Sequence, residues 1–333
     1  MTDKKVGFVI DGAAALIAQE LALLETLTKG LYPGAGGPVI PKILAGTSSG
    51  SLSTIALNAV LQAEAGKGQF GWERLKNDLL FPLRNDDVFE TGILADIERP
   101  VEILKYGYIL DTAPLRRTLE KFVQGSDYIG YQTLGDTFLP SHISAVNRNT
   151  GLTQRFFSDN PKDKGLDSVQ VLLASTAIPV VFPDREITGV GTFVDGGTGT
   201  DDSPVEALVG EAPFDELYVI APQQANPDSD MQKRHGSKLP IISNLTFAMD
   251  VRSNAILQFQ LFRATTLVKD PANAFFYTPK LSTEYNFLNF DVMEQQYTET
   301  LKWAKQNKPE LILDYLAKVN FPFKVSGDRI SVR

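Results

Sequence analysis

The chain lacks cysteine altogether and has only two histidines among its 333 residues. The absence of cysteine excludes a disulfide scaffold, a thiolate metal site and a thiol nucleophile. Neither His142 nor His235 follows an acidic residue in the Ser…Asp…His order of an ordinary α/β-hydrolase triad. We therefore expect His142 to be a packed or edge residue of a strand and His235 to be a solvated loop residue, with no histidine triad.

Positive charge is also scarce, and no long apolar run is present. Lysine and arginine number 32 against 40 aspartates and glutamates, and the net charge of −8 argues against a nucleic-acid partner. No stretch is long enough to cross a membrane, and the apolar run near the N-terminus is too short for a secretory signal. We expect a cytoplasmic protein without a transmembrane segment. Transient contact with a membrane surface is compatible with these features, and they leave the oligomeric state unknown.

Sequence patterns for cofactors are absent as well. The turn after the first expected strand lacks the G-x-G-x-x-G pattern of dinucleotide-binding proteins. The adjacent Asp201 and Asp202 are expected to be solvated loop residues, because no histidine-rich spacing supports a metal site around them. The sequence therefore predicts neither a cofactor nor a metal.

The first part of the chain alternates strand and helix patterns. A β-branched run at 6–10 predicts a buried strand. Apolar residues recur at helical spacing over 13–29, and a second short strand at 43–45 is followed by helical spacing over 52–60. The order strand, helix, strand, helix predicts a right-handed parallel unit and an α/β fold.

The remainder of the chain is expected to be richer in helix. Helical segments separated by breakers over 69–124 predict an insertion that covers one end of the sheet. Four of its aromatic residues, Phe81, Phe89, Tyr106 and Tyr108, either pack in the core or line an apolar entry path. Extended runs at 141–146 and 153–157 flank a polar turn and predict a hairpin, and helices follow in the last third.

No linker, low-complexity tract or internal repeat divides the chain. The hydrophobic content of 43% is ordinary for a globular protein with a sizeable core. We therefore expect a single domain over 1–333, in which a core at about 4–222 is followed by a helix-rich part at 223–333.

One stretch has the pattern of a catalytic elbow. Gly46-Thr47-Ser48-Ser49-Gly50 lies between an expected strand and an expected helix. In a G-x-S-x-G elbow the serine sits on a sharp, strained turn, and small residues two positions before and after it let strand and helix approach. The helix start adds N–H groups and a positive dipole end that favour an oxyanion. The pattern predicts that Ser48 is a nucleophile, and an ordinary helix cap is the alternative.

Asp195 is the best candidate for a base that activates Ser48. It ends an expected strand and precedes Gly196 and Gly197, so it should project at an edge of the sheet where backbone can approach closely. A carboxylate deprotonates a serine only when it is near and partly desolvated, because desolvation moves its pKa towards neutrality. The alternative is an Asx turn without a catalytic role.

In their order and spacing these motifs resemble the patatin-like phospholipases, which use a serine–aspartate dyad. The matching segments are GTSSG at 46–50, DTAPLRRTLEKFV at 111–123, SAVNRNTG at 144–151, LLASTAIPVVFP at 172–183 and VDGG at 194–197. The resemblance covers about the first two thirds of the chain. It implies a three-layer α/β/α fold with a mainly parallel central sheet, and hydrolysis of acyl esters in lipid-like substrates. It also implies that Ser48 attacks the ester and that Asp195 is the base, first for Ser48 and then for the deacylating water.

The segment that should supply the oxyanion hole departs from the family pattern. The family's first strand ends in a loop of the form D-G-G-G-x-R-G, whereas this chain has Asp11-Gly12-Ala13-Ala14 and lacks the basic residue. The N–H groups of Gly12, Ala13 and Ala14 remain able to donate, as does that of Ser49. Alanine, however, resists positive φ and places a methyl group beside the oxyanion.

Three functions therefore stay open. The first is a lipid acyl hydrolase of the phospholipase A or esterase type that works through an acyl-enzyme. The second is a catalytically impaired binding protein that keeps the fold, which the glycine-poor loop suggests. The third is an acyl transferase or thioesterase on soluble acyl groups, which the acidic composition suggests. In each, the polar stretch at 198–203 is expected to reshape the mouth of the site.

Overall fold

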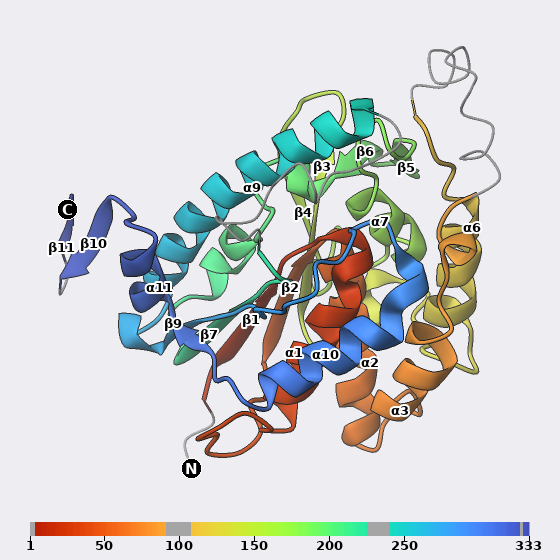
Figure 1. Ribbon diagram of the computed structural model, residues 1–333. Helices are drawn as coiled ribbons and strands as arrows, with labels where there is room; N and C mark the ends of the chain where they lie inside the picture. Colours follow the sequence, from red (N-terminus) through yellow and green to blue (C-terminus); the bar gives the residue numbers. More distant parts are fainter. Residues whose placement is uncertain (1–3, 91–107, 225–239, 327–328, 333) are drawn as a thin grey trace.

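The computed structural model describes residues 4–90, 108–224, 240–326 and 329–332, and it places a sheet between two helical layers (Figure 1). The strands of the main sheet are β1 (Val6–Ile10), β2 (Ile43–Thr47), β3 (Ser141–Asn147), β4 (Thr153–Phe157), β5 (Arg185–Ile187), β6 (Gly191–Asp195), β7 (Glu216–Ile220), β8 (Ala274–Tyr277) and β9 (Glu310–Leu311). Their order is β5-β6-β3-β2-β1-β7-β8-β9, and β4 also pairs with β3. A separate hairpin, β10 (Phe323–Ser326) and β11 (Arg329–Val332), follows near the C-terminus.

The centre of the sheet is parallel and its edges are antiparallel. The five strands β3, β2, β1, β7 and β8 run in the same direction. By contrast, β4 and β6 are antiparallel to β3, β5 to β6 and β9 to β8. The expected α/β fold and the expected hairpin are therefore confirmed. The sequence did not predict β8, because a run of four apolar residues carries no periodicity that separates strand from helix.

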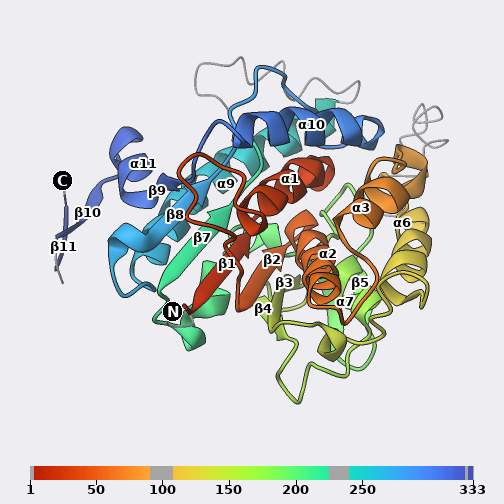
Figure 2. The same cartoon turned by 90° about the horizontal axis from the view of Figure 1, so that it is seen from below.

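The side chains of β1 show how the sheet joins both helical layers. Phe8 and Ile10 belong to one apolar core, with α1 (Ile17–Thr28), α2 (Ser49–Glu64), α7 (Ser168–Ser175) and α10 (Met293–Ala304). Val9 belongs to the other, with α9 (Pro240–Thr265) and α11 (Ile312–Lys318). Alternate side chains of a strand face opposite sides, so a short apolar run serves both cores. Figures 1 and 2 show α1, α2 and α10 on one side of the sheet and α9 on the other, which confirms the three-layer α/β/α arrangement.

The described part of the helical insertion joins the layer that contains α1, α2 and α7. Its elements are α3 (Trp72–Arg74), a π-helical segment (Leu75–Leu80), α6 (Ala113–Leu119) and a second π-helical segment (Glu120–Gln124). Their apolar side chains share the core of α2 and α7, and Figure 2 shows α3 and α6 on the same flank of the molecule. The helix expected within 93–106, together with Tyr106, lies outside the described residues.

Two of the insertion's aromatic residues can be assigned to packing. Phe89 is buried between the rings of Phe182 and Phe290, at centroid distances of 6.4 and 6.2 Å. Phe81 makes an edge-to-face contact with Tyr297 at 5.5 Å. Such aromatic pairs stabilise a core beyond their buried area.

Across the described segments of the chain, no helix is both long and apolar enough to cross a bilayer.

Candidate active site

A sharp turn joins β2 to α2 and places Ser48 at its apex. Ser48 has φ 53° and ψ −127°, a conformation that L-residues avoid and that costs on the order of 1–3 kcal/mol. Close packing requires the flanking glycines. An added Cβ at Gly46 would lie 2.2 Å from the carbonyl oxygen of Gly50, and one at Gly50 would lie 2.2 Å from that of Ile10. The G-x-S-x-G stretch therefore has the geometry of a nucleophile elbow.

Strand pairing brings Asp195 to the same end of the sheet. Thr47 at the end of β2 is paired with Ser144 on β3, and the next residue of β3, Ala145, is paired with Asp195 at the end of β6. Gly196 lets the backbone close in, since a Cβ there would lie 2.5 Å from the Ser144 carbonyl oxygen and 2.9 Å from Thr47 Cγ2. Asp195 is thereby placed beside the elbow.

The Asp195 carboxyl is buried and only partly hydrogen-bonded. Its Oδ1 accepts a hydrogen bond of 2.8 Å from the N–H of Gly197, whereas its buried Oδ2 has no partner with hydrogen-bond geometry among the described residues. Burial raises the pKa of Asp195 to about 7, although interactions with the Ser48 hydroxyl and the Gly197 N–H oppose the rise. The nearby Asp202 raises this pKa further. A carboxyl with a near-neutral pKa and an unpaired oxygen close to a hydroxyl has the properties of a general base.

Ser175 of α7 anchors the backbone of the elbow. The Ser48 N–H donates to Ser175 Oγ at 3.0 Å, and the Ser175 hydroxyl donates to the Ser144 carbonyl at 2.8 Å. The N–H of Ser48 is thus occupied and is not an oxyanion donor. Ser175 lies within a segment that matched the family, yet nothing in the sequence indicated this contact.

The loop after β1 lies directly against Ser48. In this loop the N–H of Ala13 donates a hydrogen bond of 2.8 Å to Ser49 Oγ, so it is not available to an oxyanion. The N–H groups of Gly12, Ala14 and Ser49 make no hydrogen bond within the described parts of the chain. Ala14 has φ 45°, so the loop does adopt the positive φ that alanine resists. Of the four predicted oxyanion donors, those of Gly12, Ala14 and Ser49 have no partner among the described residues, whereas that of Ala13 has one.

Asp201 is not the solvated loop residue that the sequence predicts. It is fully buried, and the Arg155 guanidinium on β4 holds its two carboxylate oxygens at 2.6 and 2.7 Å. The Ser144 hydroxyl donates to the same carboxylate, and the Asp201 carbonyl accepts from the Thr47 hydroxyl. A buried carboxylate needs such partners. The stretch at 198–203 is thus anchored to β2, β3 and β4. Within the described residues, no cluster of side chains could hold a metal ion.

His142 is a structural residue of β3, as expected. Its Nδ1 lies 2.7 Å from the Ala207 carbonyl oxygen, and its ring packs edge-on against Phe157. Burial lowers the pKa of His142, which favours the neutral imidazole. His235 lies outside the described residues.

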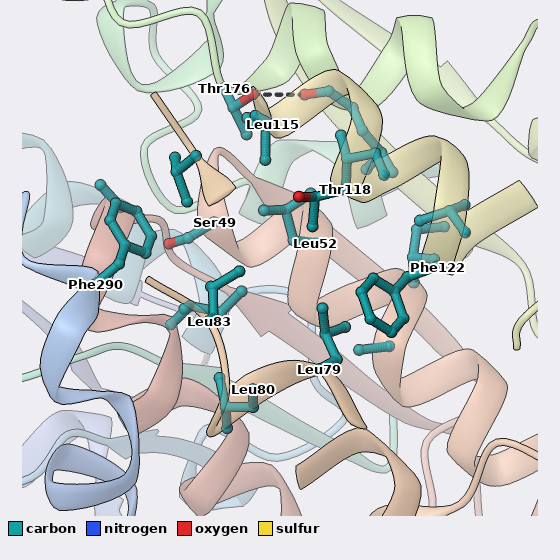
Figure 3. Close-up of a pocket in the computed structure, with 18 of the residues that line it drawn as sticks. Ser49, Leu52, Leu79, Leu80, Leu83, Leu115, Thr118, Phe122, Thr176 and Phe290 are labelled. Carbon is teal, nitrogen blue, oxygen red and sulfur yellow. Dashed lines mark hydrogen bonds between the residues drawn. The ribbon is translucent and has the colours of Figure 1, made fainter. Parts of the chain in front are cut away.

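An apolar pocket of about 100 Å³ lies beside Ser48 and Ser49 (Figure 3). Its lining includes Leu52 and Ile55 of α2, Leu79, Leu83 and Phe122 of the insertion, Ile178 and Phe182 after α7, and Phe290. Figure 3 shows Ser49 and Phe122 on opposite sides, with Leu52 and Leu79 between them. Among the described residues that line it, the polar side chains are those of Ser48, Ser49, Thr118 and Thr176. Such a pocket can hold a hydrocarbon chain whose polar end is at the elbow.

Comparison with known proteins places these features in a family. A family model described as patatin-like phospholipase matches residues 8–209. No protein of curated function matches the chain in sequence.

Several solved structures are distantly similar. VipD from Legionella pneumophila is 13% identical, with 91% of this chain and 67% of VipD covered at a TM-score of 0.39. The type III effector protein ExoU is 13% identical, with coverages of 96% and 54% and a TM-score of 0.37. In the complex of full-length SpcU with full-length ExoU from the type III secretion system of Pseudomonas aeruginosa, the matching chain is 13% identical. The match covers 77% of this chain and 53% of that one, at a TM-score of 0.32. The chain spans about half to two thirds of these proteins, and likeness at this level carries no information about the site.

Proposed function

Because this chain belongs to the patatin-like phospholipase family, we propose that it hydrolyses acyl esters of lipids, as a phospholipase A or esterase, through a Ser48–Asp195 dyad. The observation that supports this most directly is the strained Ser48, which lies between a buried Asp195 carboxyl and an apolar pocket. The Ser48 hydroxyl can attack a carbonyl carbon, the Asp195 carboxylate can accept a proton, and the pocket can hold an acyl chain.

In the proposed reaction, Ser48 Oγ attacks the ester carbonyl carbon while its proton passes to the Asp195 carboxylate. Asp195 then gives this proton to the departing alcohol, and the acyl group remains as an ester on Ser48. Asp195 next takes a proton from the water that attacks the acyl carbonyl. It then gives this proton to Ser48 Oγ as the acyl–oxygen bond breaks and the fatty acid is released. We assign the oxyanion to the N–H groups of Gly12, Ala14 and Ser49, where a single donor typically contributes about 10²–10³-fold to turnover.

A non-catalytic lipid-binding protein is the second candidate. The observation that favours it is the loop at Gly12-Ala13-Ala14, in which one N–H is occupied and Ala14 is held at positive φ. Such a protein would keep the apolar pocket and the fold. It would differ from the hydrolase in the reactivity of Ser48.

A serine-directed probe separates these candidates. We expect a fluorophosphonate to modify Ser48 stoichiometrically, as read from the mass of the peptide, and the same preparation to hydrolyse p-nitrophenyl esters and mixed phospholipid vesicles. Heat-unfolded protein is the control for non-specific labelling. A protein that binds fatty acid but neither reacts with the probe nor hydrolyses esters would be a binding protein. A rate that does not increase when the substrate forms micelles would favour a thioesterase or transferase on soluble acyl groups.

The rate should rise with pH through about 7. Asp195 must be ionised to accept the Ser48 proton, and its pKa in the folded protein is about 7. Below that value kcat/KM is expected to fall about tenfold per pH unit, because the protonated carboxyl is not a base. The measurement is kcat/KM on a soluble ester from pH 5 to 8. An inflection near 4, the ordinary value for aspartate, would contradict the burial of this group.

A further inference from the structure

Glu20 is a buried carboxyl that the proposed reaction does not use. It lies on α1 with no exposed surface, and its two oxygens accept hydrogen bonds of 2.6 Å from the hydroxyls of Ser49 and Ser53 on α2. In the described part of the chain no lysine or arginine contributes to its titration. Burying a carboxyl without a cation is unfavourable unless it is neutral or well hydrogen-bonded. Because Glu20 is bonded to α2, the helix that follows the elbow, its burial bears on the geometry of the site.

The Ser49 hydroxyl connects Glu20 to the oxyanion loop. Ser49 Oγ accepts the N–H of Ala13 at 2.8 Å and donates to Glu20 at 2.6 Å. A hydroxyl has a single proton, so donation to Glu20 leaves a lone pair for Ala13. The result is a continuous chain of hydrogen bonds from the loop to the core. It fixes the loop at Ala13, between the unpaired N–H groups of Gly12 and Ala14.

We propose that Glu20 is a positioning residue for the oxyanion hole and that it acts in its neutral form. Through Ser49 it holds the loop so that the N–H groups of Gly12 and Ala14 remain free for the oxyanion. It has to be neutral, because a buried negative charge next to the oxyanion hole would oppose the oxyanion. This inference rests on the proposed hydrolase function.

The hydrogen bonds around Glu20 accommodate the neutral acid. Ser49 can donate to one carboxyl oxygen while the protonated oxygen donates to Ser53, so the carboxyl keeps both of its partners. Burial raises the pKa of Glu20 to about 8, although the hydrogen bonds from Ser49 and Ser53 and the nearby N–H of Ala13 oppose the rise. The raised pKa favours the neutral acid near neutral pH.

Asp11, directly after β1, is a titratable side chain that interacts with Glu20. Other titratable groups of α1 and of the helices packed against it include Glu25 on α1, Glu64 on α2, and Glu294, Tyr297, Glu299 and Lys302 on α10. Lys29 and Lys76 lie beside Glu25 towards the end of α1. Asp11 is a second buried carboxyl, and its interaction with Glu20 disfavours a negative charge on both. Tyr297 pairs with Glu25. At the level of Glu20, α10 presents the uncharged Gln296. Among the described residues no lysine or arginine offsets a negative charge on Glu20.

Glu20→Gln tests the neutral form. The amide has nearly the same shape and no charge, its oxygen can accept from Ser49, and its NH₂ group can donate to Ser53. We expect the wild-type rate to fall about tenfold from pH 8 to 9.5, as Glu20 ionises. The Glu20→Gln variant should keep a near-normal kcat at pH 7.5 and lack this decline. A decline of the same size in the variant would overturn the role of a neutral Glu20.

Glu20→Ala tests the positioning. Removing the carboxyl frees the Ser49 hydroxyl, so kcat should fall about tenfold or more while KM changes little. The control is Thr26→Val, which removes another buried hydroxyl from α1 without touching the chain of hydrogen bonds. A kcat in Glu20→Ala equal to that of Thr26→Val would refute the positioning role.

Amide hydrogen exchange provides a measurement that needs no turnover. The Ala13 N–H should exchange about tenfold faster in Glu20→Ala than in the wild type or Thr26→Val, because its acceptor is no longer oriented. Unchanged exchange would refute the positioning role even in an active enzyme. Faster exchange in a protein without hydrolase activity would support the positioning of the loop while the proposed function failed.

Discussion

Replacing Ser48 with alanine is expected to lower kcat on an acyl ester by about 10⁴–10⁶-fold, the range seen when the nucleophile of a serine hydrolase is removed. The oxygen that forms the acyl-enzyme would be absent, and Asp195 would have no hydroxyl to deprotonate. Because the backbone of Ser48 is held by the Ser175 hydroxyl and by close packing of the elbow glycines, the fold should persist. The measurement is single-turnover hydrolysis together with the thermal unfolding midpoint.

A second variant at the same position separates catalysis from turn structure. Ser48→Gly also removes the hydroxyl, but glycine tolerates the observed φ of 53°. It should be equally inactive and at least as stable as Ser48→Ala, since relief of strain offsets the greater flexibility of the unfolded chain. If Ser48 were only part of a turn, both variants would hydrolyse esters at the wild-type rate, and the dyad would be wrong.

The elbow was predictable because its determinants are local. Gly46, Ser48 and Gly50 lie within five residues, and the reason for each glycine is contact with a backbone oxygen of an adjacent element. The proposed partnership with Asp195 depends instead on the pairing of β2, β3 and β6, which no local pattern encodes. The sequence indicated it only through the order of motifs that the family shares.

Buried polar contacts between distant residues could not be predicted from the sequence. Asp201 was expected in solvent because acidic pairs in loops usually are solvated, yet its partner Arg155 lies on β4, 46 residues earlier in the chain. Glu20 likewise stands in an ordinary helical pattern, and its partners belong to α2. Single-sequence reasoning reads periodicity well, whereas such contacts depend on which elements become neighbours.

Gly12→Ala is the substitution in the oxyanion loop with the largest expected effect. An added Cβ would lie 2.4 Å from Ser48 Cβ and 2.4 Å from the Thr47 carbonyl oxygen, closer than such atoms approach in proteins. The loop or the nucleophile must therefore move, and a displacement of about 1 Å at reacting groups costs about 10²-fold in rate. Loss of an aligned donor at the same place would add a further 10²–10³-fold. We expect kcat to fall by about 10³-fold or more.

The control for Gly12→Ala is the same substitution at Gly36, where an added Cβ meets nothing within 4 Å and φ is not in the left-handed region. Gly36→Ala should leave activity unchanged and stability equal or slightly higher, because alanine restricts the unfolded chain. If Gly12→Ala retained wild-type kcat and labelling by the fluorophosphonate, the loop would not contact the reacting serine, and the oxyanion would have to be bound elsewhere. If Gly12→Ala lost turnover but kept its unfolding midpoint, the loss would lie in the transition state, because a folded protein with an intact Ser48 and Asp195 would lack only the geometry of its donors.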